Sequence, residues 1–514
     1  MLGDDHAERW QRMCRDYGTN TRDNAGLADG LQFHTESAAG DSDCPVSDTS
    51  VLTFTDAAGS PDSLSVAEFW QSRQVLADLY QFAKSRRCGP WAMLGNVMLR
   101  AASAIPPDVV LPPVVGGQAS LNLYVAFAGN SGDGKGAATV AADDWLVADT
   151  MPYTAEAGSG EGMVKQFAYK QNQRGQPPAQ INMRWSVLFD VREIDSLGAI
   201  SGRNSSTMLP ILRSAYSGEA LGFSYADPTK AIKLCAHRYR FCMGVGVQPK
   251  NAGVLIHDSD GGTPQRYVWL PVLDPDMPDV RPSAPRRLTL RNWQDVAPKK
   301  KLGKNGAYTL VAGADHTALL DTESRSKDRT EIEVPEHIWV WLDRQRVEHN
   351  RGTKRIDALD AHANQTRLKV AAILMWLDGR TDKITDDDWR LSGAVMAVSV
   401  LTRKWIEQKL AAKADAAQQS IGRNQAVRDR AASEAKSQME SDDIERVAAK
   451  IIRLLGEAAE PVARWKLTQK IAARDRHLFD DAVGHLVDTE RVRKIDTKRS
   501  GETIGYKLAL IDAS

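Results

Sequence analysis

The chain has 514 residues, with 66 basic and 66 acidic side chains and a formal net charge of zero. This length allows several domains, and the balanced charge requires any nucleic-acid-binding surface to be local. The five cysteines have no CxxC spacing, which argues against a disulfide framework and favours a reduced, cytoplasmic setting: Cys14, Cys44, Cys88, Cys235 and Cys242. Since the sequence has no apolar run of about 18 residues and no signal-peptide pattern, we expect no membrane partner.

Residues 1–62 contain twelve acidic and four basic side chains among many small polar residues. We predict an acidic, disordered tail, because so little apolar surface cannot offset the entropy lost on folding. Residues 63–113 form a predicted helical N-terminal region, in which Leu76 and Leu79 show helical spacing.

Residues 114–275 have the pattern of an α/β core with a largely parallel sheet, because apolar strands alternate with helical segments. The strands are expected at 121–128, 185–191, 239–247 and 267–272.

A glycine-rich loop, GNSGDGKG, lies between the first strand and a helix predicted at 137–146. Its glycines would let several N–H groups point at one anion, and Lys135 would add a charge for the β- and γ-phosphates of ATP. The residue that follows this lysine is usually a Ser or Thr whose hydroxyl binds Mg²⁺, but here it is Gly136. A merely structural turn is the alternative for these eight residues: Gly129, Asn130, Ser131, Gly132, Asp133, Gly134, Lys135 and Gly136.

Three acidic residues lie at the end of the second strand, where side chains of such sheets face a ligand crevice. We assign water activation to Glu193 and the metal shell to Asp190, with Asp195 in reserve. Acids solvated on a surface loop are the alternative.

Two further positions could act on the γ-phosphate. Gln248 ends the third strand and could report the state of the phosphate, although a Gln-Pro turn explains it as well. Arg266 precedes the fourth strand and could reach the nucleotide of a neighbouring subunit, the alternative being a local ion pair.

Several motifs together resemble the P-loop ATPase domains of primase–helicase proteins of phages and integrated elements. These domains, many of them classed only as a domain of unknown function, lie near the superfamily-three and AAA+ (RecA-like) ring helicases. The motifs occur in order over residues 65–275, at Phe69-Trp70, Pro90-Trp91, Ser120–Asn122, the glycine-rich loop, 158–162, 193–195, 246–249 and 262–266.

The resemblance implies a set of roles. Lys135 would bind phosphate, Glu193 would be the catalytic acid, Gln248 the sensor and Arg266 the finger between subunits of a ring, a hexamer by analogy. Arg367 would sense nucleotide from a helical lid at 335–412. Since no primase or polymerase domain is recognisable in residues 1–120, a separate chain would supply that activity.

The segment 221–233 is a predicted hairpin just ahead of the third strand. In the helicases that the chain resembles, a hairpin at this place grips DNA in the ring channel. Lys230 and Lys233 would then contact phosphates. An ordinary surface hairpin is the alternative.

The remaining chain comprises an irregular connection at 276–334, a polar helical spacer at 413–441 and a terminal domain at 442–514. Helices at 444–456, 464–473 and 477–489 followed by a β-hairpin predict a winged helix. Its wing would contact duplex DNA through five basic residues, although a protein-interaction domain has the same shape: Arg491, Arg493, Lys494, Lys498 and Arg499.

These features predict an ATP-driven, Mg²⁺-dependent DNA helicase or translocase that replicates a phage or mobile element. The first alternative is a nucleotide-gated DNA-binding initiator or regulator without unwinding activity, suggested by Gly136. A second is an ATPase whose target is a protein.

Overall fold

The computed structural model describes residues 44–56, 58–149, 152–174, 176–195, 198, 207–223, 231–258, 261–296, 320–323, 325–353, 362–499 and 502–511. The chain divides into two compact units, Met1–Ala412 and Lys413–Ser514. Helix α13 (Asp386–Gly456) begins in the first unit and ends in the second. None of the helices in the described ranges has an apolar stretch long enough to cross a lipid bilayer.

A five-stranded sheet in the order β14-β5-β13-β10-β7 forms the centre of the first unit. Every neighbouring pair is parallel, so the strands share a carboxyl edge and an amino edge. Four strands confirm the prediction, whereas short β7 was missed. The strands are β5 (Tyr124–Ala128), β7 (Tyr153–Ala155), β10 (Ser186–Val191), β13 (Arg240–Val247) and β14 (Tyr267–Pro271).

Both faces of this sheet are buried, which explains why its strands are continuous apolar runs. Along β5, Val125 and Phe127 enter one core, and Tyr124, Ala126 and Ala128 enter the other. The first core includes α4 (Pro90–Ala104), α5 (Lys135–Trp145) and α12 (Ala363–Leu377), and the second includes α6 (Gly160–Lys165) and α8 (Met208–Ser217).

The N-terminal region is folded from residue 44 onwards, which corrects the predicted boundary of the acidic tail at 62. Strand β1 (Val51–Thr55) pairs antiparallel with β2 (Pro61–Ser65), and Leu52 and Phe54 are buried. Helices α2 (Val66–Gln71) and α3 (Gln74–Ser85) follow. The rest of the predicted tail, 1–43, lies outside the described residues.

The predicted lid at 335–412 is helical, and comprises α11 (Glu336–Asn350), α12 and the start of α13. Helix α12 packs against α4 and is buried from Thr366 to Leu377, so it is part of the core. The predicted irregular connection contains three short elements: β15 (Leu288–Leu290), α10 (Trp293–Val296) and β16 (Thr330–Glu331). Strand β15 pairs with β6 (Leu146–Ala148). Strand β16 pairs with β3 (Val109–Leu111), which also pairs with β4 (Ala119–Ser120).

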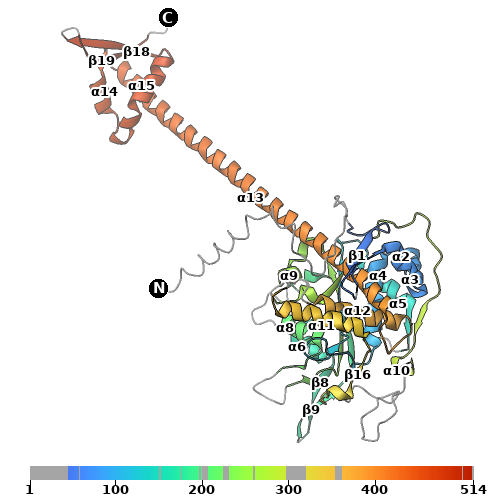
Figure 1. Ribbon diagram of the computed structural model, residues 1–514. Helices are drawn as coiled ribbons and strands as arrows, with labels where there is room; N and C mark the ends of the chain where they lie inside the picture. Colours follow the sequence, from blue (N-terminus) through green and yellow to red (C-terminus); the bar gives the residue numbers. More distant parts are fainter. Residues whose placement is uncertain are drawn as a thin grey trace. The chain divides into compact units, whose positions relative to one another are not determined.

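Two antiparallel hairpins stand at the amino edge, because each lies between a crossover helix and the start of the next sheet strand. The first, β8 (Ala168–Gln173) with β9 (Gln176–Asn182), projects from the first unit (Figure 1) and was not predicted. The second pairs β11 (Leu221–Gly222) with β12 (Lys233–Leu234), at the base of the predicted hairpin. Residues 224–230 between them, including Lys230, lie outside the described residues.

The second unit has its own core, built around Ile451, Leu467, Phe479 and Leu508. Residues 411–443 of α13 are exposed throughout, as expected of the predicted spacer. The rest of the unit comprises the end of α13, α14 (Arg464–Lys470), α15 (Phe479–Asp488) and a sheet of β17 (Val462–Ala463), β19 (Glu502–Leu510) and β18 (Val492–Arg499).

Candidate nucleotide-binding site

The glycine-rich loop connects the carboxyl end of β5 to the start of α5, as predicted. Gly132 and Gly134 have φ angles of +92° and +93°, a conformation that side chains disfavour. The Gly129 N–H donates to the Val247 carbonyl at 3.0 Å, which fixes the loop against β13. Ser131 is exposed, and the first turn of α5 leaves N–H groups without helical partners. The loop therefore presents donors on an open surface.

Lys135 fills the interior of this loop. Its Nζ donates to the carbonyl oxygens of Gly129 and Asn130, at 2.8 and 2.7 Å. Burial lowers its pKa, while the charges of Asp133 and Glu193 partly oppose this shift. Among the described residues, no carboxylate lies within ion-pair distance of Nζ. The ammonium is thus a cation held by neutral carbonyls, which an anionic ligand could replace.

Gly246 on β13 brings the elements of the site together, a role that sequence reasoning missed. A Cβ atom here would lie 2.1 Å from the Arg192 carbonyl oxygen and 3.2 Å from Lys135 Cδ. The ends of β10 and β13 and the loop lysine therefore meet at one point. The signal in the sequence was a glycine inside an apolar strand, which often marks close backbone approach.

Of the three predicted acids, Glu193 lies nearest the predicted role: it is exposed, and its charge acts on Lys135. Asp190 is half-buried on β10; burial raises its pKa, while Arg100 and Arg192 oppose that shift. Asp195 is exposed and accepts a hydrogen bond from Asn251 Nδ2 at 2.9 Å.

The predicted sensor Gln248 directly follows β13 at the carboxyl edge and is buried. Its position, two residues beyond Gly246, places it beside the meeting point of loop and strands. A 3-10 turn, η2 (Pro249–Asn251), begins after it, so the turn-forming alternative also fits.

The loop and Lys135 suit a triphosphate, but the site has few ligands for the Mg²⁺ ion that accompanies ATP. Mg²⁺ prefers oxygen ligands, and Gly136 provides no hydroxyl. A Cβ atom at Gly136 would have no heavy atom within 4 Å, so the backbone has room for a hydroxyl side chain that the sequence lacks. The remaining candidates for a metal shell are the predicted acids, Asp190 with Asp195 in reserve.

Arg266 lies at the amino edge of the sheet. It directly precedes Tyr267, which pairs with Tyr124 at the start of β5, whereas the loop follows the end of β5. The length of the strand separates them by about 15 Å. Its guanidinium donates to the Gly262 carbonyl, and burial lowers its pKa. Arg266 is therefore remote from the loop of its own chain.

Arg367 does not reach the loop, so its assignment as a nucleotide sensor finds no support. It is buried, and it donates to the carbonyl oxygens of Thr55 at 2.7 Å and Trp389 at 2.9 Å. The guanidinium also lies 3.8 Å from the Trp389 ring centroid. These contacts tie β1 to the helices, which is a packing role.

Four of the predicted DNA-binding residues have a described side-chain burial, and all four are exposed. Lys233 is exposed on β12 and forms an ion pair with Glu323 at 3.4 Å. In the second unit, Arg491, Arg493 and Lys494 are exposed at the start of β18. Lys498 and Arg499 lie at the end of the same strand.

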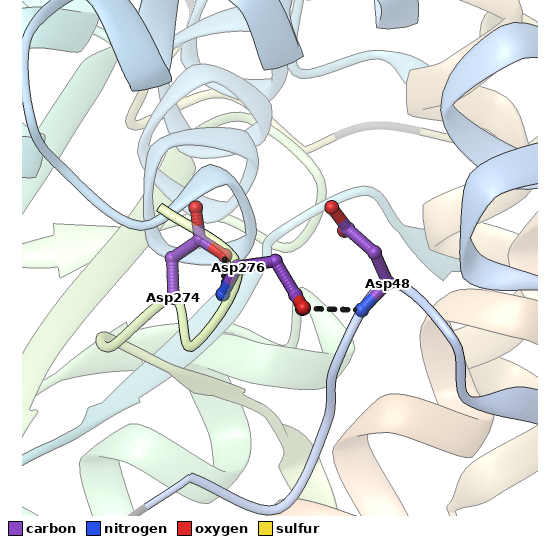
Figure 2. Close-up of side chains that lie close together, drawn as sticks. All are labelled: Asp48, Asp274 and Asp276. Atoms are coloured by element: carbon purple, nitrogen blue, oxygen red, sulfur yellow. Dashed lines mark hydrogen bonds between the residues drawn. The ribbon is translucent and has the colours of Figure 1, made fainter. Parts of the chain in front are cut away.

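Three carboxylates gather beyond the carboxyl end of β14, where Asp274 and Asp276 approach Asp48 (Figure 2). Their oxygens lie within 4.8 Å of one another, which resembles a metal site. Lys84 already supplies a cation: its Nζ lies 3.0 Å from Asp48 Oδ2 and 3.5 Å from Asp274 Oδ2. We therefore interpret the cluster as an ion network that holds the N-terminal segment on the sheet.

Comparison of the chain with protein-family models and with curated proteins found no match.

Proposed function

We propose that the first unit is an ATPase domain of the P-loop class, near the AAA+ and superfamily-three helicases. The observation that carries this proposal is Lys135, a partly buried cation in a glycine loop at the carboxyl edge of a parallel sheet; within the described part of the chain, its ammonium is held by two backbone carbonyls alone. Strand β13 separates the loop strand from β10, which ends near Glu193. Two strand spacings, about 10 Å, leave room for a γ-phosphate and a water molecule.

More particularly, we propose an ATP-driven DNA translocase or helicase that works as a ring, such as a hexamer, in replication of a phage or mobile element. The position of Arg266 is compatible with a ring, because an arginine remote from its own loop is free of a role there and could serve the nucleotide of a neighbour; its hydrogen bond to the Gly262 carbonyl also fits a purely local role. The hairpins at the amino edge and the basic start of β18 supply separate surfaces for DNA.

In ATP hydrolysis, Lys135, Glu193 and Arg266 would each have a separate role. Lys135 would exchange its two carbonyl partners for phosphate oxygens, and Glu193 would orient the attacking water. Arg266 of one subunit would stabilise the charge that develops on the phosphate bound to the next. Mg²⁺, when bound with ATP, would neutralise phosphate charge, and Asp190, with Asp195 in reserve, is the residue that would hold it.

The second unit is proposed to be a winged helix. Helix α15, the third helical segment, carries Asp480 in its first turn, where it pairs with Arg464 at 2.6 Å. Acidic residues disfavour insertion of this helix into a DNA groove. We therefore assign phosphate contact to the hairpin, through Arg491, Arg493 and Lys494.

The proposal is tested by measuring ATP hydrolysis with and without single-stranded DNA. Lys135→Ala should lower turnover by about 100-fold or more, because the loop loses its charge toward the phosphates. Lys404→Ala, at an exposed lysine on α13 of the same unit, is the matched control and should leave turnover unchanged. Equal turnover in both variants would remove the ATPase proposal.

A second function, a nucleotide-gated initiator or regulator without unwinding, is favoured by Gly136, since an incomplete metal shell permits binding with slow turnover. Strand displacement on a forked duplex separates the two. Robust unwinding excludes the regulator, whereas ATP-dependent DNA binding without unwinding supports it.

A further inference from the structure

The β8–β9 hairpin and its flanks have an unusual composition. Between residues 162 and 189 the sequence contains no acidic residue, but it contains four basic residues and seven Asn or Gln side chains. The basic residues are Lys165, Lys170, Arg174 and Arg184. A segment with this balance attracts polyanions, although the whole chain is neutral.

Lys165 is exposed at the end of α6, outside the hairpin itself, and two further basic side chains lie on the hairpin and are accessible to a ligand. Arg174 is exposed at the turn of the hairpin, and Lys170 is partly exposed on β8. Arg184 is instead engaged within the fold, since it donates to the Gln166 carbonyl and lies 3.6 Å from the Tyr153 ring centroid. The hairpin therefore offers Lys170 and Arg174 to phosphates.

Gln180 joins this hairpin to the β11–β12 hairpin. Its Nε2 donates to the Lys233 carbonyl oxygen at 2.9 Å, and its Oε1 accepts from the Lys233 N–H at 3.0 Å. Lys170 is the cross-strand partner of Gln180, so both side chains lie on the same face of the hairpin. The bridge thus places Lys170 on the face that meets β12, where Lys233 is exposed.

We propose that the two hairpins form a single arm that binds the phosphate backbone of single-stranded DNA through Lys170 and Arg174. Phosphate contacts by Lys and Arg supply most of the affinity in sequence-independent binding. Gln180 is a positioning residue, because its amide fixes one hairpin against the other. This inference deepens the proposed function and rests on it for the identity of the polymer.

The test measures the affinity of the full chain for a fluorescent oligo-dT without nucleotide, across a range of salt concentrations. Lys170→Ala/Arg174→Ala should weaken binding roughly tenfold and lower the slope of log K against log salt by about 1.4, because each phosphate contact contributes about 0.7. Gln171→Ala, at an exposed residue on the opposite face of the hairpin, is the matched control. Gln180→Ala should weaken binding without changing the slope.

Hydrolysis of ATP in the absence of DNA is the folding control, and the double variant should retain it. Repeating the binding assay in Lys135→Ala separates the two proposals, since loss of turnover with intact hairpin-dependent binding concerns the loop alone. Unchanged affinity and slope in the double variant, or no binding of oligo-dT by the wild type, would overturn the inference.

Discussion

Each edge of the central sheet has a lysine whose ammonium donates to two backbone carbonyls, but the two lysines differ in their surroundings. At the carboxyl edge, Lys135 donates to two loop carbonyls beside an open surface. At the amino edge, Lys369 donates to the carbonyls of Asn122 and Tyr216, at 2.9 and 2.7 Å, and is fully buried over the Tyr216 ring. Burial lowers the pKa of both lysines. Solvent access, and not the hydrogen-bond pattern, therefore distinguishes a cation that can accept a ligand from one that holds the fold.

The largest effect is expected for Arg266. Its substitution tests whether this arginine, at the amino edge of one subunit, acts on the nucleotide bound at the carboxyl edge of another. Arg266→Ala should lower kcat by about 10³-fold, because a finger stabilises the transition state, while ATP affinity stays nearly intact. Turnover assays and binding of a fluorescent ATP analogue measure the two quantities.

A mixing experiment gives the control. Arg266→Ala and Lys135→Ala subunits, each inactive alone, should regain hydrolysis when mixed, because some interfaces combine an intact loop with an intact finger. If the mixture stays inactive, or if Arg266→Ala loses ATP affinity, Arg266 acts within its own chain and the ring argument fails.

The second prediction is that the free energy of unfolding falls at acidic pH because of His237, a buried residue at the amino edge. His237 lies just ahead of β13, and burial, with nearby Arg329, Arg240 and Lys369, lowers its pKa to about 3. The unfolded chain binds a proton near pH 6.5 but the folded chain does not, so stability falls as the pH drops through this window. The loss between pH 7 and 5 is about 2 kcal/mol.

Urea unfolding of wild type and His237→Asn at both pH values measures this loss. Asn is suitable because it tolerates the positive φ of 55° at this position. The variant should lose less stability on acidification than the wild type. An identical loss would show that His237 is protonated in the fold.

The smallest effect is expected at Gly136, where the loop lacks the hydroxyl that usually binds Mg²⁺. Gly136→Ser would add a hydroxyl where the backbone leaves room. One added ligand contributes about 1 kcal/mol, so the Mg²⁺ concentration for half-maximal hydrolysis should fall roughly fivefold. Gly136→Ala controls for the backbone change; an equal response in both variants would separate this position from the metal.

The sequence predicted those parts of the fold that depend on local patterns. Buried runs such as Phe241–Val247 marked the sheet, and glycine spacing marked the loop. Strand β7 was missed because it has only three residues, two of them exposed. Hairpin β8–β9 was missed because its strands are rich in amides, and the fold of 44–62 because Leu52 and Phe54 are few among acids.

The nearness of a side chain to the loop was predictable only where chain order fixes it. Glu193 follows β10, which is the second strand from β5 in the sheet, so topology alone brings it near Lys135. Arg367 shows the limit, since its carbonyl partners Thr55 and Trp389 are distant in sequence. Gly246 shows another, because the close approach of Arg192 is a property of the assembled sheet.

The fully exposed stretch of α13, residues 411–443, has a practical consequence. Its only large apolar residues are Ile421, Val427 and Met439, so packing contributes little to its persistence as a helix. Such a segment opens locally at low cost and is therefore vulnerable to proteases. Brief trypsin treatment should cut after Arg423 or Arg428 and release two fragments, each retaining its own apolar core.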